Sequence, residues 1–139
     1  MPVESNPARR QSNRFRLLIV DDMPRVREEL RRLLELTDRV QVVGEAGNGQ
    51  EAIRQAETLR PDVVLMDLEM PLVDGWEATR EIKSRQLAER VVVLTMHVDL
   101  ESTQRALQAG ADAIVPKGTE FNNLMQAITH QPLEDNEKK

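Results

Sequence analysis

Five short apolar runs, each followed by a segment of helical periodicity, constrain the fold of this chain more than any other feature. The runs are rich in Val, Ile and Leu, and they span Phe15–Val20, Val40–Val43, Val63–Met66, Val91–Leu94 and Ala113–Val115. Short runs of this kind, without polar alternation, are typical of strands that helices cover on both faces of a sheet.

The intervening segments repeat apolar residues at spacings of three and four. Pro24 suits the first turn of a helix, and Gly110 suits the end of one. The first predicted helix begins at Pro24. The other four cover Gly49–Leu59, Gly75–Lys83, Leu100–Ala109 and Phe121–Ile128. Strands that alternate with helices predict an α/β fold, a doubly wound five-stranded parallel sheet with right-handed crossovers.

Composition narrows the class of protein. The 139 residues suit one domain, and the absence of cysteine excludes a disulfide scaffold, a Cys-ligated zinc site and a thiol nucleophile. No apolar run approaches the roughly 20 residues of a membrane span, and the first residues do not resemble a secretory signal. We therefore expect a cytoplasmic protein without a membrane partner.

The charge distribution predicts the domain boundaries and one class of partner. The net charge is −5, although arginines cluster in the first 16 residues. The rest of the chain is acidic, which argues against nucleic-acid binding by this domain. We expect a disordered N-terminal extension over residues 1–15, a folded domain over 16–130 and a flexible tail over 131–139.

Polar residues follow four of the five predicted strands. They are Asp21 and Asp22 after the first, Asp67 after the third, Thr95 after the fourth and Lys117 after the fifth. In parallel sheets, sites lie beyond the carboxyl ends of the strands, so these side chains should converge. The second strand is followed only by Glu45 and a turn without an obvious catalytic group.

This set of residue types indicates phosphoryl chemistry. Three adjacent carboxylates repel one another unless a divalent cation is present, and all-oxygen ligands favour Mg²⁺. An ammonium and a hydroxyl suit phosphoryl oxygens, and a carboxylate is available as nucleophile. A single Asp at a strand end would equally fit a cap or a turn.

Several segments of the chain resemble one family in the family's own order. They are LLIVDDMPRVREELRRLLE, EAGNGQEAI, PDVVLMDLEMPLVDGWEATREIK, VVVLTMHV and AGADAIVPKG. Together they resemble the receiver domain of two-component response regulators, most closely receivers that precede a LuxR-like helix-turn-helix domain. The resemblance implies a flavodoxin-like sheet of order 2-1-3-4-5 over residues 16–130.

The resemblance also implies roles for the site residues. Asp67 would be the phosphoacceptor for a sensor histidine kinase or phosphotransfer protein. Asp21, Asp22 and Asp67 would bind Mg²⁺ together with the backbone carbonyl of Glu69. The domain would be a signalling module and not an enzyme, controlling an output through transcription regulation and forming a homodimer on phosphorylation.

The switch region matches the family in part. Thr95 would be the switch hydroxyl and Lys117 the partner of a phosphoryl oxygen. Many receivers carry an aromatic residue three positions before the lysine, where this chain has Ile114, and many carry proline after it, where this chain has Gly118. These departures question the switching mechanism more than the phosphorylation.

Five further features have simpler interpretations. Met96 either lies across the site mouth, slowing hydrolysis of the phosphoryl group, or points into the core. We expect His97 in a surface loop, His130 as a helix C-cap and Trp76 partly buried. The charged run REELRR, residues 27–32, is interpreted as a solvated helix face.

Three alternatives remain. The first is a receiver-like scaffold regulated only by binding. The second is a flavodoxin-like cofactor binder, which would need a phosphate-cradling loop where this chain has DDMPR. The third is a phosphohydrolase, which usually needs a second Asp where this chain has Glu69.

Overall fold

The computed structural model describes residues 14–68, 75–96 and 99–130. Five parallel strands form one sheet in the order β2-β1-β3-β4-β5. The elements, in chain order, are β1 Phe15–Val20, α2 Pro24–Glu35, β2 Val40–Ala46, α3 Gly49–Leu59, β3 Val63–Asp67, α4 Gly75–Ser84, β4 Arg90–Thr95, α5 Leu100–Ala109, β5 Ala113–Pro116 and α6 Phe121–Thr129. The predicted fold class and strand order are therefore confirmed.

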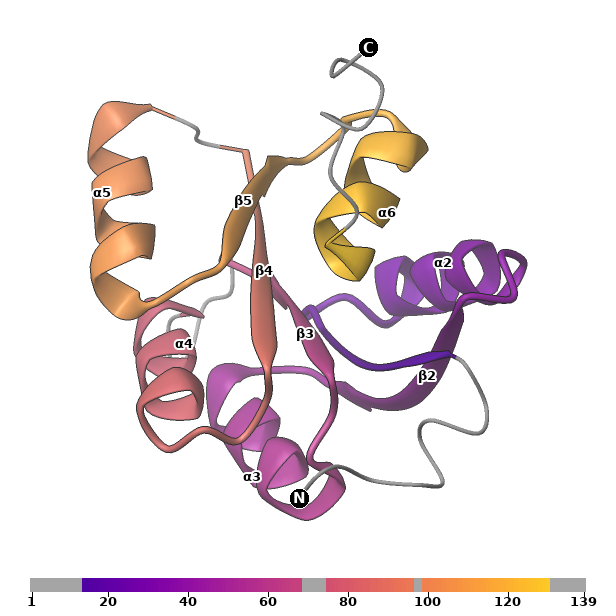
Figure 1. Ribbon diagram of the computed structural model, residues 1–139, viewed down its shortest axis with the longest axis horizontal. Helices are drawn as coiled ribbons and strands as arrows, with labels where there is room; N and C mark the ends of the chain where they lie inside the picture. The colour runs from indigo at the N-terminus through magenta and orange to yellow at the C-terminus, as the bar shows by residue number, and fades with distance from the viewer. Residues whose placement is uncertain (1–13, 69–74, 97–98, 131–139) are drawn as a thin grey trace, which may run out of the picture.

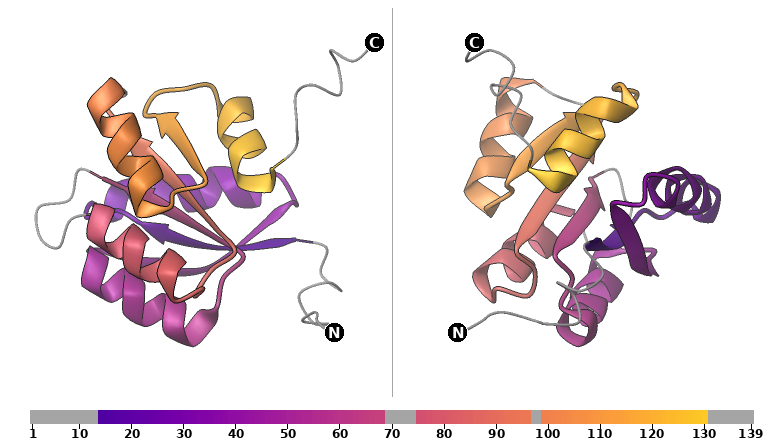
Figure 2. Two further views of the ribbon diagram at one scale, coloured as in Figure 1. Left: turned by 60° about the vertical axis from the view of Figure 1, so that its left-hand side comes forward. Right: turned by 45° about the vertical axis from the view of Figure 1, so that its right-hand side comes forward.

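Helices cover both faces of the sheet, with α2 and α6 on one side and α3, α4 and α5 on the other (Figures 1 and 2). Alternate residues of β1 supply the two cores: Leu17 and Ile19 pack toward Leu34 and Ile128, whereas Leu18 packs with the core that α3 and α4 cover. Successive side chains of a strand point to opposite faces of the sheet, so a strand that is buried on both faces has a continuous apolar sequence, as observed.

Most predicted boundaries agree with the structure to within a residue or two. The main difference is β2, which continues through Gly44 and Glu45 to Ala46 instead of ending at Val43. Pairing with β1 extends the strand, with a register shift between Leu17 and Leu18. Gly44 lies close to α3, where an added Cβ would come within 2.7 Å of Leu59 Cδ1, so a side chain there would require the end of Leu59 to shift.

The chain termini bear on the predicted domain boundaries. β1 begins at Phe15, one residue before the predicted start of the folded domain. Arg14 is described as well, and its guanidinium lies 3.6 Å from Asp38 Oδ1. Residues 1–13 and 131–139 lie outside the described part of the chain. None of the described helices combines the length and the apolar character needed to cross a lipid bilayer.

Candidate phosphoacceptor site

The sheet brings the predicted site residues to its carboxyl edge. Asp67 is the last residue of β3, and it pairs in register with Leu94 of β4. Thr95 is the last residue of β4, and its carbonyl accepts a hydrogen bond from Lys117 N at 2.9 Å. Asp21 follows β1, and its N–H donates to Ala46 O at 3.0 Å. Neighbouring parallel strands therefore deliver each of these groups to one edge, as expected.

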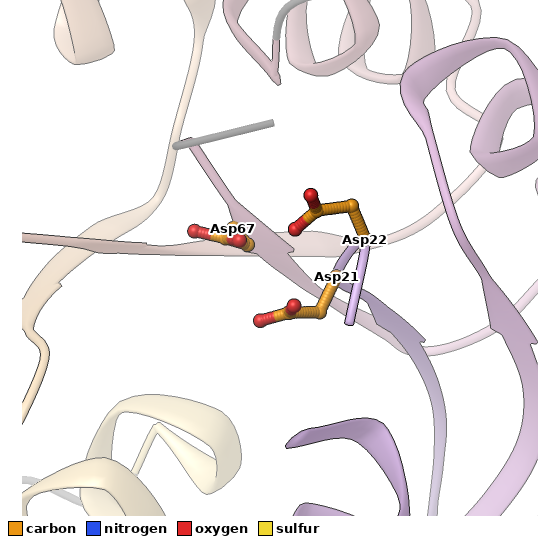
Figure 3. A group of neighbouring side chains, drawn as sticks. All are labelled: Asp21, Asp22 and Asp67. Atoms are coloured by element: carbon orange, nitrogen blue, oxygen red, sulfur yellow. The ribbon is translucent and has the colours of Figure 1, made fainter. Parts of the chain in front are cut away.

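Three carboxylates lie side by side at this edge, as Figure 3 shows. One ligand oxygen from each of Asp21, Asp22 and Asp67 lies within 4.8 Å of the others. Asp21 and Asp67 are 3% and 2% exposed, whereas Asp22 is only half-buried. A cation placed among them would have oxygen ligands on the protein side and room for water on the Asp22 side, so the cluster fits a hard divalent metal ion.

Burial sets the protonation of Asp21. Desolvation raises the pKa of Asp21 to about 6, and the negative charge of Asp67 and a side-chain hydrogen bond with it act in the same direction. A backbone hydrogen bond from Met23 N to Asp21 Oδ1, 2.9 Å long, and the charge of Lys117 oppose the rise. The cluster therefore holds more negative charge than its environment stabilises without a cation.

Lys117 places a positive charge next to Asp67. Its Nζ lies 2.7 Å from Asp67 Oδ1, and its side chain is 28% exposed. The next residue, Gly118, has a φ of +85°, a left-handed backbone conformation that favours glycine. The lysine at the end of β5 thus reaches across β4 to the carboxylate of β3.

Gly75 begins a helix, α4, as the sequence predicted, and it packs closely against the end of β3. An added Cβ would lie 3.0 Å from Asp67 O and 2.7 Å from Leu68 Cδ2. A side chain at this position would push against the backbone of Asp67. Glu69 and Pro71 lie outside the described residues, and so does His97.

A cavity of about 590 Å³ opens beside the carboxylates. Its polar end is formed by the three Asp residues and Lys117, and its far end by apolar side chains of α2 and α6, among them Leu30 and Phe121. This volume is in the range of small-molecule sites, so a phosphoryl group with a hydrated cation has ample space.

The structure decides between the two positions considered for Met96 and corrects the interpretation of the REELRR run in part. The Met96 side chain is 65% exposed, so it does not point into the core. The REELRR run is solvated at Glu28, Glu29 and Arg32, but Arg27 and Arg31 both bond the carboxylate of Glu45. These contacts connect residues that are 14 and 18 positions apart, and the local charge pattern did not reveal them.

Two other interpretations, those of Trp76 and His130, are confirmed, and the structure also places Ile114. Trp76 is partly buried, and the guanidinium of Arg105 lies 5.1 Å from its ring centroid. His130 is the C-cap of α6, in a left-handed conformation, and its N–H donates to Gln126 O. Ile114, at the position of the usual aromatic, is half-buried in β5 opposite Val93.

Glu45 is the site-adjacent residue that the sequence reasoning missed. Burial acts to raise its pKa, but hydrogen bonds from Arg31 and Arg27 outweigh that effect and hold the pKa of Glu45 below its usual range. The spacing of the two arginines at i and i+4 placed them on one face of the predicted helix, and that was the only available signal.

Comparisons with known proteins support the fold and identify the family. The model of the response regulator receiver domain matches residues 17–129. The response regulator GacA of Pseudomonas viridiflava is 42% identical over 114 residues, covering 82% of this chain and 53% of GacA. The nitrate/nitrite response regulator protein NarL of Escherichia coli K12 is 36% identical over 115 residues, covering 83% of this chain and 53% of NarL.

A solved structure gives the same result. A LuxR-family two-component response regulator from Aurantimonas sp. SI85-9A1 has a TM-score of 0.78 at 39% identity, covering 84% of each chain. The chain spans about half the length of the curated relatives named above. The family match favours a receiver over a flavodoxin-like cofactor binder or a phosphohydrolase. With the acidic cluster at the predicted strand ends and the family model covering the described domain, this chain belongs to the response regulator receiver domains of two-component systems.

Proposed function

We propose that this receiver accepts one phosphoryl group on Asp67 from a sensor histidine kinase or a phosphotransfer protein, in the presence of Mg²⁺. The change in conformation that follows would control an output domain or partner, as in transcription regulation. The observation that carries the proposal is the 2.7 Å contact between Lys117 Nζ and Asp67 Oδ1 inside a buried acidic cluster. That contact places a positive charge beside the carboxylate that would become an acyl phosphate.

Asp67 is suited to be the nucleophile. One carboxylate oxygen would attack the phosphorus of a phosphohistidine, forming the O–P bond as the P–N bond breaks, and the imidazole would leave with a proton. Bound Mg²⁺ would supply charge neutralisation for the phosphoryl oxygens and the carboxylates. Asp21, Asp22 and Asp67 would hold it, together with the backbone carbonyl of Glu69, which lies outside the described residues.

Lys117 and Thr95 would receive the phosphoryl group. The Lys117 ammonium would keep its position and pair with a phosphoryl oxygen. The Thr95 hydroxyl, at the buried end of β4, would donate to another oxygen and draw the loop after β4 inward. With Ile114 in place of an aromatic residue, the movement of Thr95 would be transmitted by aliphatic packing in β5.

The proposal includes a location and partners. The domain would act in the cytoplasm, would not bind nucleic acid or membrane itself, and would form a homodimer when phosphorylated. The net charge of −5 supports the absence of nucleic-acid and membrane binding, because both partners are negatively charged.

Phosphorylation of variants tests the proposal. The protein is incubated with Mg²⁺ and a small phosphodonor, and the intact mass and the labelled peptide are measured. One phosphoryl group is expected at Asp67, none in Asp67→Ala, and strongly reduced labelling in Asp22→Ala. Asp38→Asn is the matched control, because Asp38 is an exposed carboxylate whose positive φ of 63° asparagine also tolerates. Full labelling of Asp67→Ala would refute the assignment.

A further inference from the structure

A charged cluster beside the acidic site connects α2 to the end of β2. Arg27 Nε donates to Glu45 Oε1 at 2.9 Å, and Arg31 Nε donates to Glu45 Oε2 at 2.7 Å. The Arg27 and Glu45 side chains are 18% and 27% exposed, so both are largely shielded from water. Arginine and carboxylate in this setting form charge-assisted bonds stronger than those of an exposed pair.

Arg27 makes a second contact, to the backbone of Asp21, which Arg31 does not share in the described part of the chain. Its Nη1 donates to the main-chain carbonyl of Asp21 at 2.6 Å. The backbone N–H of Asp21 donates to Ala46 O at 3.0 Å. The backbone of Asp21 is therefore held on one side by β2 and on the other by the Arg27 guanidinium, which Glu45 in turn holds.

The bonded carbonyl belongs to the peptide that joins Asp21 to Asp22. The orientation of this peptide determines the directions in which both carboxylates project. The N-cap residue Met23 makes no side-chain cap hydrogen bond, and its N–H donates to Asp21 Oδ1. Arg27 adds a second hydrogen bond between the first turn of α2 and Asp21, this one to the backbone. The negative charge of Glu45 offsets part of the positive charge of Arg27, so the main contribution of Arg27 to the site is to position the peptide.

We infer that Arg27, oriented by Glu45, is a positioning residue for the acidic site: it holds the Asp21–Asp22 peptide so that both carboxylates can bind one divalent cation. This inference rests on the proposed function. The positioning role requires a side chain that donates to Glu45 and to the Asp21 carbonyl at the same time. The planar guanidinium of arginine has donors in this fixed arrangement, whereas the ammonium of lysine does not.

Magnesium titration of two arginine variants tests the inference. Arg27→Lys retains the charge and loses the fork. Arg31→Lys is the matched control, because Arg31 bonds the same carboxylate and lies near Glu35, but in the described part of the chain it does not bond the Asp21 peptide. Calorimetry should show Mg²⁺ binding weakened by roughly 10-fold in Arg27→Lys, the effect typical of groups that orient metal ligands. Arg31→Lys should change it by less than about twofold, because a half-exposed ion pair contributes little.

A kinetic readout separates positioning from a general loss of structure. In Arg27→Lys the Mg²⁺ concentration that gives half-maximal phosphorylation should rise by the same factor, while the rate at saturating Mg²⁺ stays within about threefold of wild type. Glu45→Gln should shift the Mg²⁺ requirement in the same direction and keeps the test valid if an Arg27 variant does not fold. Urea unfolding of each variant reports its stability separately.

The outcomes are distinguishable from failure of the proposed function. If the wild type binds Mg²⁺ and is labelled at Asp67, but Arg27→Lys and Arg31→Lys bind Mg²⁺ equally well, the positioning role is refuted and the proposed function stands. Equal weakening in both arginine variants would also refute it. A wild type that neither binds Mg²⁺ nor is labelled would overturn both.

Discussion

The buried carboxylate of Asp21 should make the metal-free protein less stable as the pH rises. Its pKa is about 6 in the folded protein against an ordinary value of 3.8. A group whose folded pKa is raised stabilises the fold below its unfolded pKa, and this stabilisation is lost as the pH rises through the folded pKa. We therefore expect the loss between about pH 4 and pH 7.

The magnitude follows from the same two values. The difference corresponds to at most about 3 kcal/mol of unfolding free energy. Solvent at the cavity mouth screens the charge, which reduces the expected effect to about 1–2 kcal/mol. Saturating Mg²⁺ should remove the loss, because a cation that binds only the folded state stabilises it and favours the ionised carboxylate.

Asp21→Asn isolates this effect. Asparagine has almost the same shape, and its side-chain oxygen can still accept the hydrogen bond from Met23 N. In chelator, the variant should be more stable than wild type at pH 7.5 by about 1–2 kcal/mol and nearly equal at pH 4. In excess Mg²⁺ the advantage should disappear.

Urea unfolding of both proteins across this pH range, with and without Mg²⁺, makes the measurement. Asp38→Asn serves as the control for a surface carboxylate, since the Asp38 side chain is 87% exposed. The reasoning is refuted if the difference between wild type and Asp21→Asn in chelator is the same at pH 4 and pH 7.5.

Three further predictions concern Met96 at the site mouth, Thr79 in the core and the assembly of the protein. Met96→Ala should accelerate dephosphorylation by roughly 2- to 10-fold, or about 0.4–1.4 kcal/mol of barrier, because the exposed side chain can shield the phosphoryl group from water; an unchanged rate of phosphate release would contradict this. Thr79→Val should raise the free energy of unfolding by up to about 1 kcal/mol, because the buried Thr79 Oγ1 has no hydrogen-bond partner in the described part of the chain; a destabilised variant in urea would count against it. Beryllofluoride with Mg²⁺ should convert the protein to a dimer in light scattering, and a mass independent of beryllofluoride over a wide concentration range would argue against dimerisation on phosphorylation.

Local patterns were sufficient for the architecture and for most of the candidate site. The apolar runs predicted all five strands because strands buried on both faces need no polar alternation. Asp67, Thr95 and Lys117 were identified because a parallel sheet places its strand ends at one edge. These inferences depend only on residues close in the sequence and on the rules of α/β topology.

The sequence alone could not place contacts between distant segments. The continuation of β2 through Gly44 and Glu45 contradicts local strand propensity, and it follows from pairing with β1. The bonding of Arg27 to Glu45 and Asp21 depends on how α2 lies against β2, which no short window contains. Met96 was open to two interpretations for the same reason, since exposure depends on the packing of the whole chain.

The sequence by itself determined the fold class, the order of the elements and the residue types that reach the carboxyl edge of the sheet. Only the tertiary structure decided which charges pair, how deeply each carboxylate is buried and therefore how far the pKa of Asp21 rises. The physical reason is range: strand and helix periodicity are properties of neighbouring residues, whereas desolvation and ion pairing arise from groups brought together by the packing of distant elements.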